Sequence, residues 1–86
     1  SQRELERARR AVAELDEAKR IVFMLYEIEG QSCKEIAVGL DVPTGTVYSR
    51  LHAARREFRS AFERLERGQT EKLGSAELRR ARPVLT

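Results

Sequence analysis

Residues 32–55 decide the fold, and they read SCKEIAVGLDVPTGTVYSRLHAAR. Ser32 and Glu35 fit a capping box, in which the serine hydroxyl and the glutamate carboxylate each satisfy a free backbone N–H at the start of a helix. Asp41-Val42-Pro43 ends that short helix, because proline disfavours helical geometry in the residue before it. Thr44 is then expected to cap a new helix immediately. The stretch therefore predicts two helices separated by a three-residue break.

The apolar residues of this stretch predict a helix-turn-helix arrangement between the two helices. The expected inward positions are, in order, Ile36, Ala37, Leu40, Val42 and Val47. A small residue at Ala37 lets the helices cross closely, and Val42 is expected to fill the corner of the turn. Asp41 stands where many such motifs have glycine, and aspartate is one of the few other residues that tolerate a positive φ. We therefore expect the motif to occupy about residues 32–56.

Two further helices are expected before the motif. In residues 2–15 the apolar side chains recur at the three- and four-residue intervals of an amphipathic helix, at Leu5, Ala8, Val12 and Leu15. Asp16 is expected to cap a second helix that reaches about Glu29, with Gly30 as its left-handed C-terminal cap. Apolar residues nearly encircle this second helix between Ile21 and Ile28, so it is predicted to be the central helix of the bundle.

The last helix is predicted to be long. Its apolar residues continue the same period, at Val47, Leu51, Ala54, Phe58, Phe62 and Leu65. The pattern persists to about Arg67 and lapses after Gly68, so residues 68–86 are expected to be a tail that is flexible or docked on a partner. The predicted fold is all-α, with one small four-helix domain over residues 1–67 and a C-terminal helix-turn-helix.

Composition excludes several classes of function. The chain has 86 residues, of which 36% are charged and 6% aromatic, so one small helical domain with no room for a catalytic pocket is expected. Cys33 is the single cysteine and His52 the single histidine, which excludes an internal disulfide and a zinc site. Neither an enzyme nor a cofactor is expected. Since no apolar run is long enough to span a membrane and no leader segment is recognisable, we predict a cytoplasmic location.

The distribution of charge is more informative than the net charge of +3. Residues 21–43 carry one basic and four acidic groups, whereas residues 44–67 carry six and three. Within residues 44–56 there are three arginines and no acid. Such a run is typical of a surface that faces phosphates, although arginines alone fit a solvated helix face equally well.

Helical geometry predicts which side of the last helix is exposed. At about 100° per residue, the buried stripe is centred near Leu51. The opposite side carries Gly45, Ser49, His52, Ala53 and Arg56, with Tyr48 and Arg55 on one flank and Arg50 on the other. Small residues permit close approach to a major groove, polar tips meet base edges, and arginines reach phosphates. This side is therefore the expected DNA-binding surface.

The same residues also carry a resemblance to a known family. More than half the chain resembles region 4 of the sigma-70 family, in particular the extracytoplasmic function (ECF) group. The matching words are LDE at 15–17, RIVF at 20–23, EIEG at 27–30, SCKEIA at 32–37 and PTGTVYSRLHAAR at 43–55. Three positions depart from the pattern: Tyr48 replaces a usual lysine or arginine, Ala53 a frequent arginine, and Cys33 a common aromatic residue.

The resemblance implies a promoter-recognition subunit of bacterial RNA polymerase, whose region 4 reads the −35 element of duplex promoter DNA and docks on the β-flap of the polymerase core. An anti-sigma factor is a further implied partner. Family members contact −35 bases from positions that match Tyr48, Ser49, His52 and Ala53. The complete set of expected DNA-binding residues is Lys34, Thr44, Thr46, Tyr48, Ser49, Arg50, His52, Ala53, Arg55 and Arg56. Phe23, Met24 and Tyr26 are the expected partner-binding residues, and their simplest alternative role is core packing.

Two other functions fit the same sequence. One is a helical protein-interaction module, in which the helix-turn-helix is vestigial and the apolar second helix is the working surface. The other is the DNA-binding output domain of a response regulator, which shares the four-helix layout. An enzyme ranks third, because no acid–base pair, nucleophile constellation or glycine-rich phosphate loop is recognisable.

Overall fold

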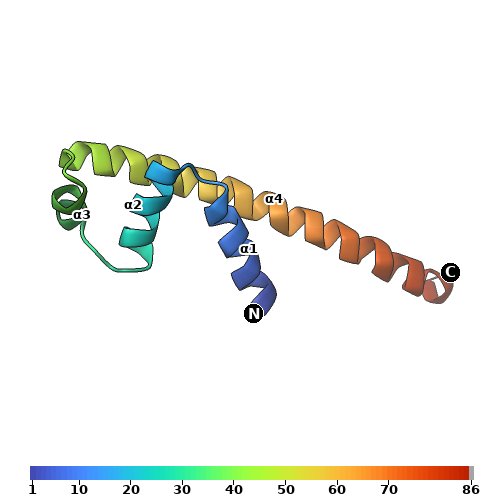
Figure 1. Cartoon of the computed structure of the whole chain (residues 1–86). Coiled ribbons are helices and arrows are strands. Elements are labelled where there is room, and N and C mark those ends of the chain that lie inside the picture. The colour runs from blue at the N-terminus through green and yellow to red at the C-terminus, as the bar shows by residue number, and fades with distance from the viewer. Residues whose placement is uncertain (86) are drawn as a thin grey trace.

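The computed structural model contains four helices and confirms the all-α prediction (Figure 1). They are α1 (Gln2–Ala13), α2 (Glu17–Glu27), α3 (Cys33–Leu40) and α4 (Thr44–Leu85). The structure describes the backbone of residues 1–85 and the side chains of residues 1–68. Within residues 1–85 there is no β-strand.

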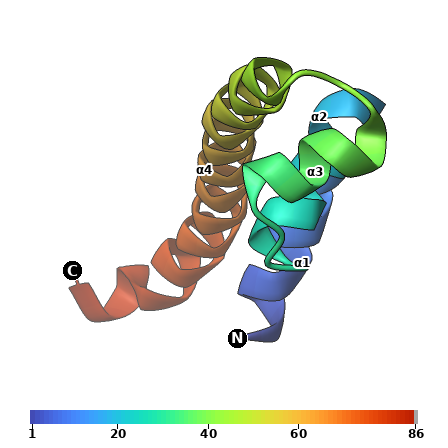
Figure 2. The same cartoon turned by 90° about the vertical axis from the view of Figure 1, so that its left-hand side faces the viewer.

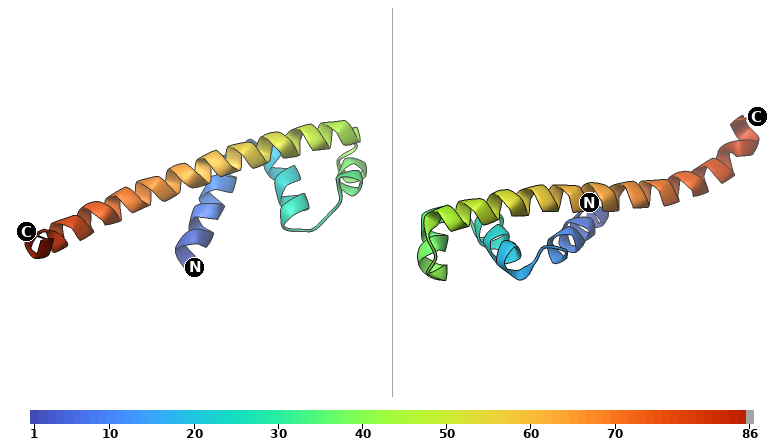
Figure 3. Two further views of the ribbon diagram at one scale, coloured as in Figure 1. Left: turned by 180° about the vertical axis from the view of Figure 1, so that it is seen from behind. Right: turned by 90° about the horizontal axis from the view of Figure 1, so that it is seen from above.

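The long helix α4 organises the molecule. Each of α1, α2 and α3 packs against α4, and α2 also packs against α3. Figures 1 and 2 show the three shorter helices gathered along the N-terminal part of α4, with α3 at its very start. Figure 3 shows the same arrangement from behind and from above, with α4 continuing well past α1. The molecule is consequently elongated, at 62 × 19 × 16 Å.

Two expectations about the helices are wrong. The predicted central helix was residues 17–29, but α4 is the element that the other three share. Met24 of α2 and Ile28, which follows α2, remain exposed. The last helix was expected to end near Arg67, but α4 continues to Leu85. Gly68 lies inside it, because a single glycine lowers helix stability by only about 1 kcal/mol relative to alanine. Whether residues 68–86 dock on a partner stays a prediction, since the side chains after Gly68 lie outside the described ones.

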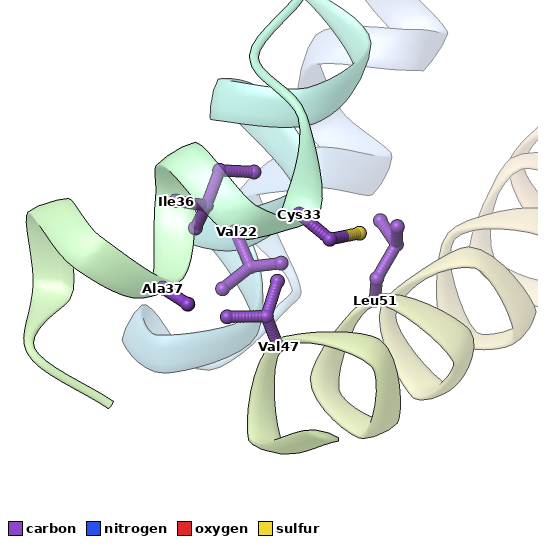
Figure 4. Close-up of a cluster of buried hydrophobic side chains, with 6 residues drawn as sticks. All are labelled: Val22, Cys33, Ile36, Ala37, Val47 and Leu51. Atoms are coloured by element: carbon purple, nitrogen blue, oxygen red, sulfur yellow. The ribbon is translucent and has the colours of Figure 1, made fainter. Parts of the chain in front are cut away.

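The main core lies where α2, α3 and α4 meet. It consists of Val22, Cys33, Ile36, Ala37, Val47 and Leu51, drawn in Figure 4. Val22, Ile36 and Val47 come from three different helices, point toward one another and are fully buried. The predicted inward positions Leu40 and Val42 are half-buried against this cluster. The core thus confirms the proposed register of the helix-turn-helix.

A second core cluster joins α1 and α2 to the middle of α4. Leu15, Phe23 and Ala54 are buried there, with Val12 and Phe58 packed against them. The ring centroids of Phe23 and Phe58 are 4.9 Å apart, a favourable distance for an aromatic pair. On α1 the sequence pattern was partly misleading: Ala11 is fully buried, whereas Leu5 remains 62% exposed.

The helix ends follow the predicted chemistry with one exception. Asp16 accepts a hydrogen bond from the Lys19 backbone N–H at 3.0 Å and caps α2. Gly30 has a φ of 73° and Asp41 a φ of 56°, so both adopt the left-handed conformation expected of them. Thr44 does not precede α4 as a cap but is its first residue, because the Val47 N–H already bonds to the Pro43 carbonyl.

Candidate nucleic-acid interface

Helix α3 begins with a capping box and ends in a turn that backbone hydrogen bonds hold. At the start of α3 the Ser32 N–H donates to the Glu35 carboxylate at 3.0 Å, and the Glu35 N–H donates to the Ser32 hydroxyl at 3.1 Å. These bonds hold the pKa of Glu35 below its ordinary value, the backbone N–H of Ser32 being the main cause. At the other end the Val42 N–H donates to the Ala37 carbonyl at 3.0 Å. Both ends of α3 are thereby closed by local hydrogen bonds.

The first turns of α4 expose the side that helical geometry predicted. Ser49 and His52 are exposed, and so is Gly45 one turn earlier. Tyr48 is 59% exposed on the flank, while Ala53 is half-buried. These groups combine a hydroxyl, an imidazole and a phenol with small residues that permit close approach. A surface of this kind can meet the base edges of a major groove.

The remaining predicted DNA-binding residues differ in how exposed they are. Lys34 is exposed in the first turn of α3, while Thr44 and Thr46 are half-buried at the start of α4. Arg56 is exposed, and Arg50 is half-buried in a hollow that Asp16 and Glu17 also line. Among the described residues, neither Arg50 nor Arg56 forms an ion pair.

Arg55 differs from the other two arginines because it is held within the molecule. Its Nε donates to Glu27 Oε1 at 2.8 Å, and its guanidinium carbon lies 4.9 Å from the ring centroid of Tyr26. The hydrogen bond with Glu27 is the main reason why the pKa of Arg55 is raised. Both contacts connect α4 to α2. The Arg55 side chain, which was predicted to bind phosphate, is therefore held against α2.

The predicted partner-binding residues divide in the same way. Phe23 is only 8% exposed and packs on Phe58, and Tyr26 is half-buried beneath Arg55, so both fit the alternative role of core packing. Their role as partner contacts stays a prediction. Met24 is 41% exposed as expected. Sequence reasoning missed its two exposed neighbours, Leu5 at 62% and Ile28 at 64%. The sequence shows that both residues are apolar. The helical period predicted that Leu5 faces the core, and periodicity alone could not show that it is exposed.

Leu5, Met24 and Ile28 line an apolar groove between α1 and α2. The groove has a volume of about 580 Å³. Its walls also include Val12 and the edge of Phe58, and its charged neighbours are Arg9 and Arg20. Apolar surface of this kind, bordered by charged side chains, is typical of a contact with another protein. We call these three exposed residues the apolar groove.

Metal sites, reactive cysteines and membrane-spanning helices are other features that could indicate a function. In residues 1–68 no group of histidine, cysteine or acidic side chains is placed to hold a metal ion. Cys33 is a free, buried thiol in the main core. Of the helices that the structure describes, none is both long and apolar enough to cross a membrane.

The fold and the exposed start of α4 together define a helix-turn-helix protein of the DNA-binding class. Comparison with protein families makes this more specific. The chain matches the family described as Sigma-70, region 4, over residues 5–58, which is more than half its length. It therefore belongs to the sigma-70 region 4 family, whose members are DNA-binding domains of transcription and not enzymes. No solved structure matches the chain.

Proposed function

We propose that this chain is the −35-recognition domain of a sigma factor of the ECF group. It reads duplex promoter DNA with the start of α4 and brings RNA polymerase core to the promoter through a separate surface. The observation that carries the proposal is the exposed set Tyr48, Ser49 and His52 at the start of α4, inside a segment that belongs to sigma-70 region 4. The −35 contacts of the family fall on these positions.

Charge near this surface supports binding to the sugar-phosphate backbone. Lys34 of α3 and Arg56 of α4 are exposed, and Arg50 of α4 is half-buried. Few cationic groups reach the backbone, because Arg55 is engaged with Glu27. The isolated domain is therefore expected to bind DNA weakly and with strong dependence on salt, since each phosphate contact releases counterions.

The experiment compares one variant with a control of equal charge. Ser49→Glu/His52→Glu places two acids on the proposed groove-reading side, and Gln2→Glu/Ala13→Glu places two acids at exposed positions of α1. Affinity for a −35-type duplex and for a scrambled duplex is measured by fluorescence anisotropy at low salt. We expect the first variant to lose its preference for the −35 duplex and the control to keep it. Equal losses in the two variants would contradict the proposed reading side.

The apolar groove supports the second half of the proposal. Leu5, Met24 and Ile28 present apolar side chains to solvent from two adjacent helices, away from the start of α4. An amphipathic helix that places its apolar face in such a groove is a common mode of protein recognition. The polymerase β-flap is the proposed occupant, and an anti-sigma factor that covers the same groove is the alternative. This groove also makes the protein-interaction module the second candidate function.

A further inference from the structure

A second groove lies on the other side of α1, between α1 and α4, and its walls are basic. It has a volume of about 410 Å³. Its lining residues are Arg3, Glu6, Arg7, Arg10, Arg64, Leu65 and Gly68. We call Arg3, Arg7, Arg10 and Arg64 the arginine groove. Neither the start of α4 nor the apolar groove contains any of these residues.

Spacing on α1 explains why three of the arginines share one wall. Arg3, Arg7 and Arg10 follow one another at intervals of four and three residues, which places them on one face of a helix. The guanidinium of Arg7 lies 5.7 Å from the ring centroid of Phe62, so this side chain is held against α4. Arg3 and Arg10 are exposed, and neither has an ion-pair partner in the described part of the chain.

The carboxylates near the groove neutralise only part of its charge. Glu6 lies 3.7 Å from Arg9, an arginine outside the groove, and Glu14 forms an ion pair with Arg64. Since Arg3 and Arg10 keep unpaired charge, the groove retains an excess of positive charge. Arginine matches carboxylates particularly well, because its planar guanidinium can donate two parallel hydrogen bonds to one carboxylate.

The position of the groove argues against the DNA that α4 reads. Arg64 is twelve residues after His52 in α4, which is about 18 Å along the helix and about a third of a turn around it. The arginine groove therefore lies away from the first turns of α4, where Ser49 and His52 are exposed. This separation favours an anionic occupant other than the duplex that these two residues meet.

The shape of the groove favours a helix as occupant. The four- and three-residue spacing of its arginines matches the spacing of acidic residues on one face of a neighbouring helix. Leu65 supplies an apolar contact between the charges, and a Cβ added at Gly68 would meet nothing within 4 Å. We propose that the arginine groove binds an acidic amphipathic helix of a partner protein, independently of promoter reading.

The test uses the 86-residue chain and a synthetic alanine-rich helix with glutamates at intervals of four and three and one leucine between them. A matched peptide carries glutamine in place of each glutamate. Binding at low ionic strength is followed by anisotropy, and by NMR of the arginine Nε–Hε groups and the Gly68 N–H. We expect the acidic peptide to shift the signals of Arg3, Arg10 and Gly68, and the glutamine peptide to leave them unchanged.

Two variants separate the groove from net charge. Arg3→Glu/Arg10→Glu is expected to weaken the acidic peptide about tenfold, or about 1.4 kcal/mol. Arg59→Glu/Arg67→Glu makes the same change of charge at exposed positions outside the groove and is expected to have little effect. Gly68→Trp should obstruct the peptide while circular dichroism reports an intact fold.

Several outcomes would overturn the proposal. Equal binding of the two peptides would mean that carboxylates are not what the groove recognises. Equal weakening by the two charge variants would reduce the effect to net charge. A tenfold loss of duplex binding in Arg3→Glu/Arg10→Glu, but not in the control variant, would assign the groove to a nucleic-acid backbone. Saturation of the groove by inorganic phosphate at a lower concentration than the peptide would assign it to a small anion. Failure of Ser49→Glu/His52→Glu to affect DNA would contradict only the promoter-reading function.

Discussion

At the scale of single residues, the ion pair between Arg55 and Glu27 changes how the basic face of α4 is understood. Sequence alone grouped Arg50, Arg55 and Arg56 as one phosphate-binding set. In the structure Arg55 bonds to Glu27 and covers Tyr26, and both partners belong to α2. A DNA phosphate that contacts Arg55 must therefore compete with a carboxylate 2.8 Å away. The periodicity of α4 could not reveal this, because Glu27 lies 28 residues earlier in the chain.

This competition leads to a prediction for Glu27→Gln. Removing the carboxylate's charge frees Arg55 for phosphate, so affinity for duplex DNA should rise severalfold at low salt, and the slope of log affinity against log salt should steepen by about one. Glu29→Gln is the matched control, since Glu29 is exposed and makes the same change of charge nearby. An equal gain in both variants would show that only net charge matters.

Val47 gives a prediction about the core. It is fully buried between α2 and α3, so Val47→Asp places an unpaired carboxylate among apolar side chains. That change should cost several kcal/mol, most of the stability of so small a domain, and thermal melts followed by circular dichroism should show an unfolded chain. Ser49→Asp, two residues later and exposed, should melt close to the unaltered protein. A cooperative melt for Val47→Asp would exclude the proposed register.

At the scale of helices, the short-range signals predicted the structure best. The caps at Asp16 and Ser32, the left-handed Gly30 and Asp41, and the inward residues of α3 are all confirmed. Each depends on chemistry within a few residues. Thr44 is the short-range exception, since it is the first residue of α4 and not its cap. Two other failures depend on long-range packing: α4 is the shared helix although α2 has the more continuous apolar run, and Leu5 has no neighbour to cover it.

The capping box of α3 gives a prediction on the same scale. Ser32→Ala removes the hydroxyl that accepts the Glu35 N–H at 3.1 Å, so the free energy of unfolding should fall by about 1 kcal/mol. Urea denaturation measures this change. Ser60→Ala is the control, because Ser60 is exposed within α4, where alanine is the better helix former. A smaller loss for Ser32→Ala than for Ser60→Ala would mean that the box contributes nothing.

The same box predicts how stability depends on pH. The pKa of Glu35 is held below its ordinary 4.5, mainly by the Ser32 N–H, so its stabilising effect is present above that value. The effect is lost as the pH falls through the lowered pKa, where the carboxylate takes up a proton. The stability difference between the unaltered protein and Glu35→Gln should therefore shrink on acidification below pH 4.5. A difference that stays constant down to pH 2 would contradict this account.

At the scale of the whole molecule, three separate surfaces can be distinguished on the four helices. The start of α4 carries the proposed DNA-facing side, the apolar groove lies between α1 and α2, and the arginine groove lies between α1 and α4. Helix α1 borders both grooves, because its apolar residues lie on one flank and its arginines on another. The sequence predicted the exposed side of α4 directly. It could not show the grooves, since each forms only when α1 settles against another helix.

This separation predicts that DNA binding and polymerase binding can be lost independently. Leu5→Ser/Met24→Ser/Ile28→Ser removes three exposed apolar side chains and leaves Phe23 in the core. It should weaken binding to polymerase core at least tenfold, since burying one such side chain is worth about 1.5–3 kcal/mol, and should leave duplex binding unchanged. Ser49→Glu/His52→Glu should do the reverse. Pull-down with purified core and anisotropy with duplex DNA measure the two effects on the same preparations. If the serine variant keeps the polymerase and loses DNA, the apolar groove serves the fold or the DNA-facing side, and the division of labour proposed for these surfaces is wrong.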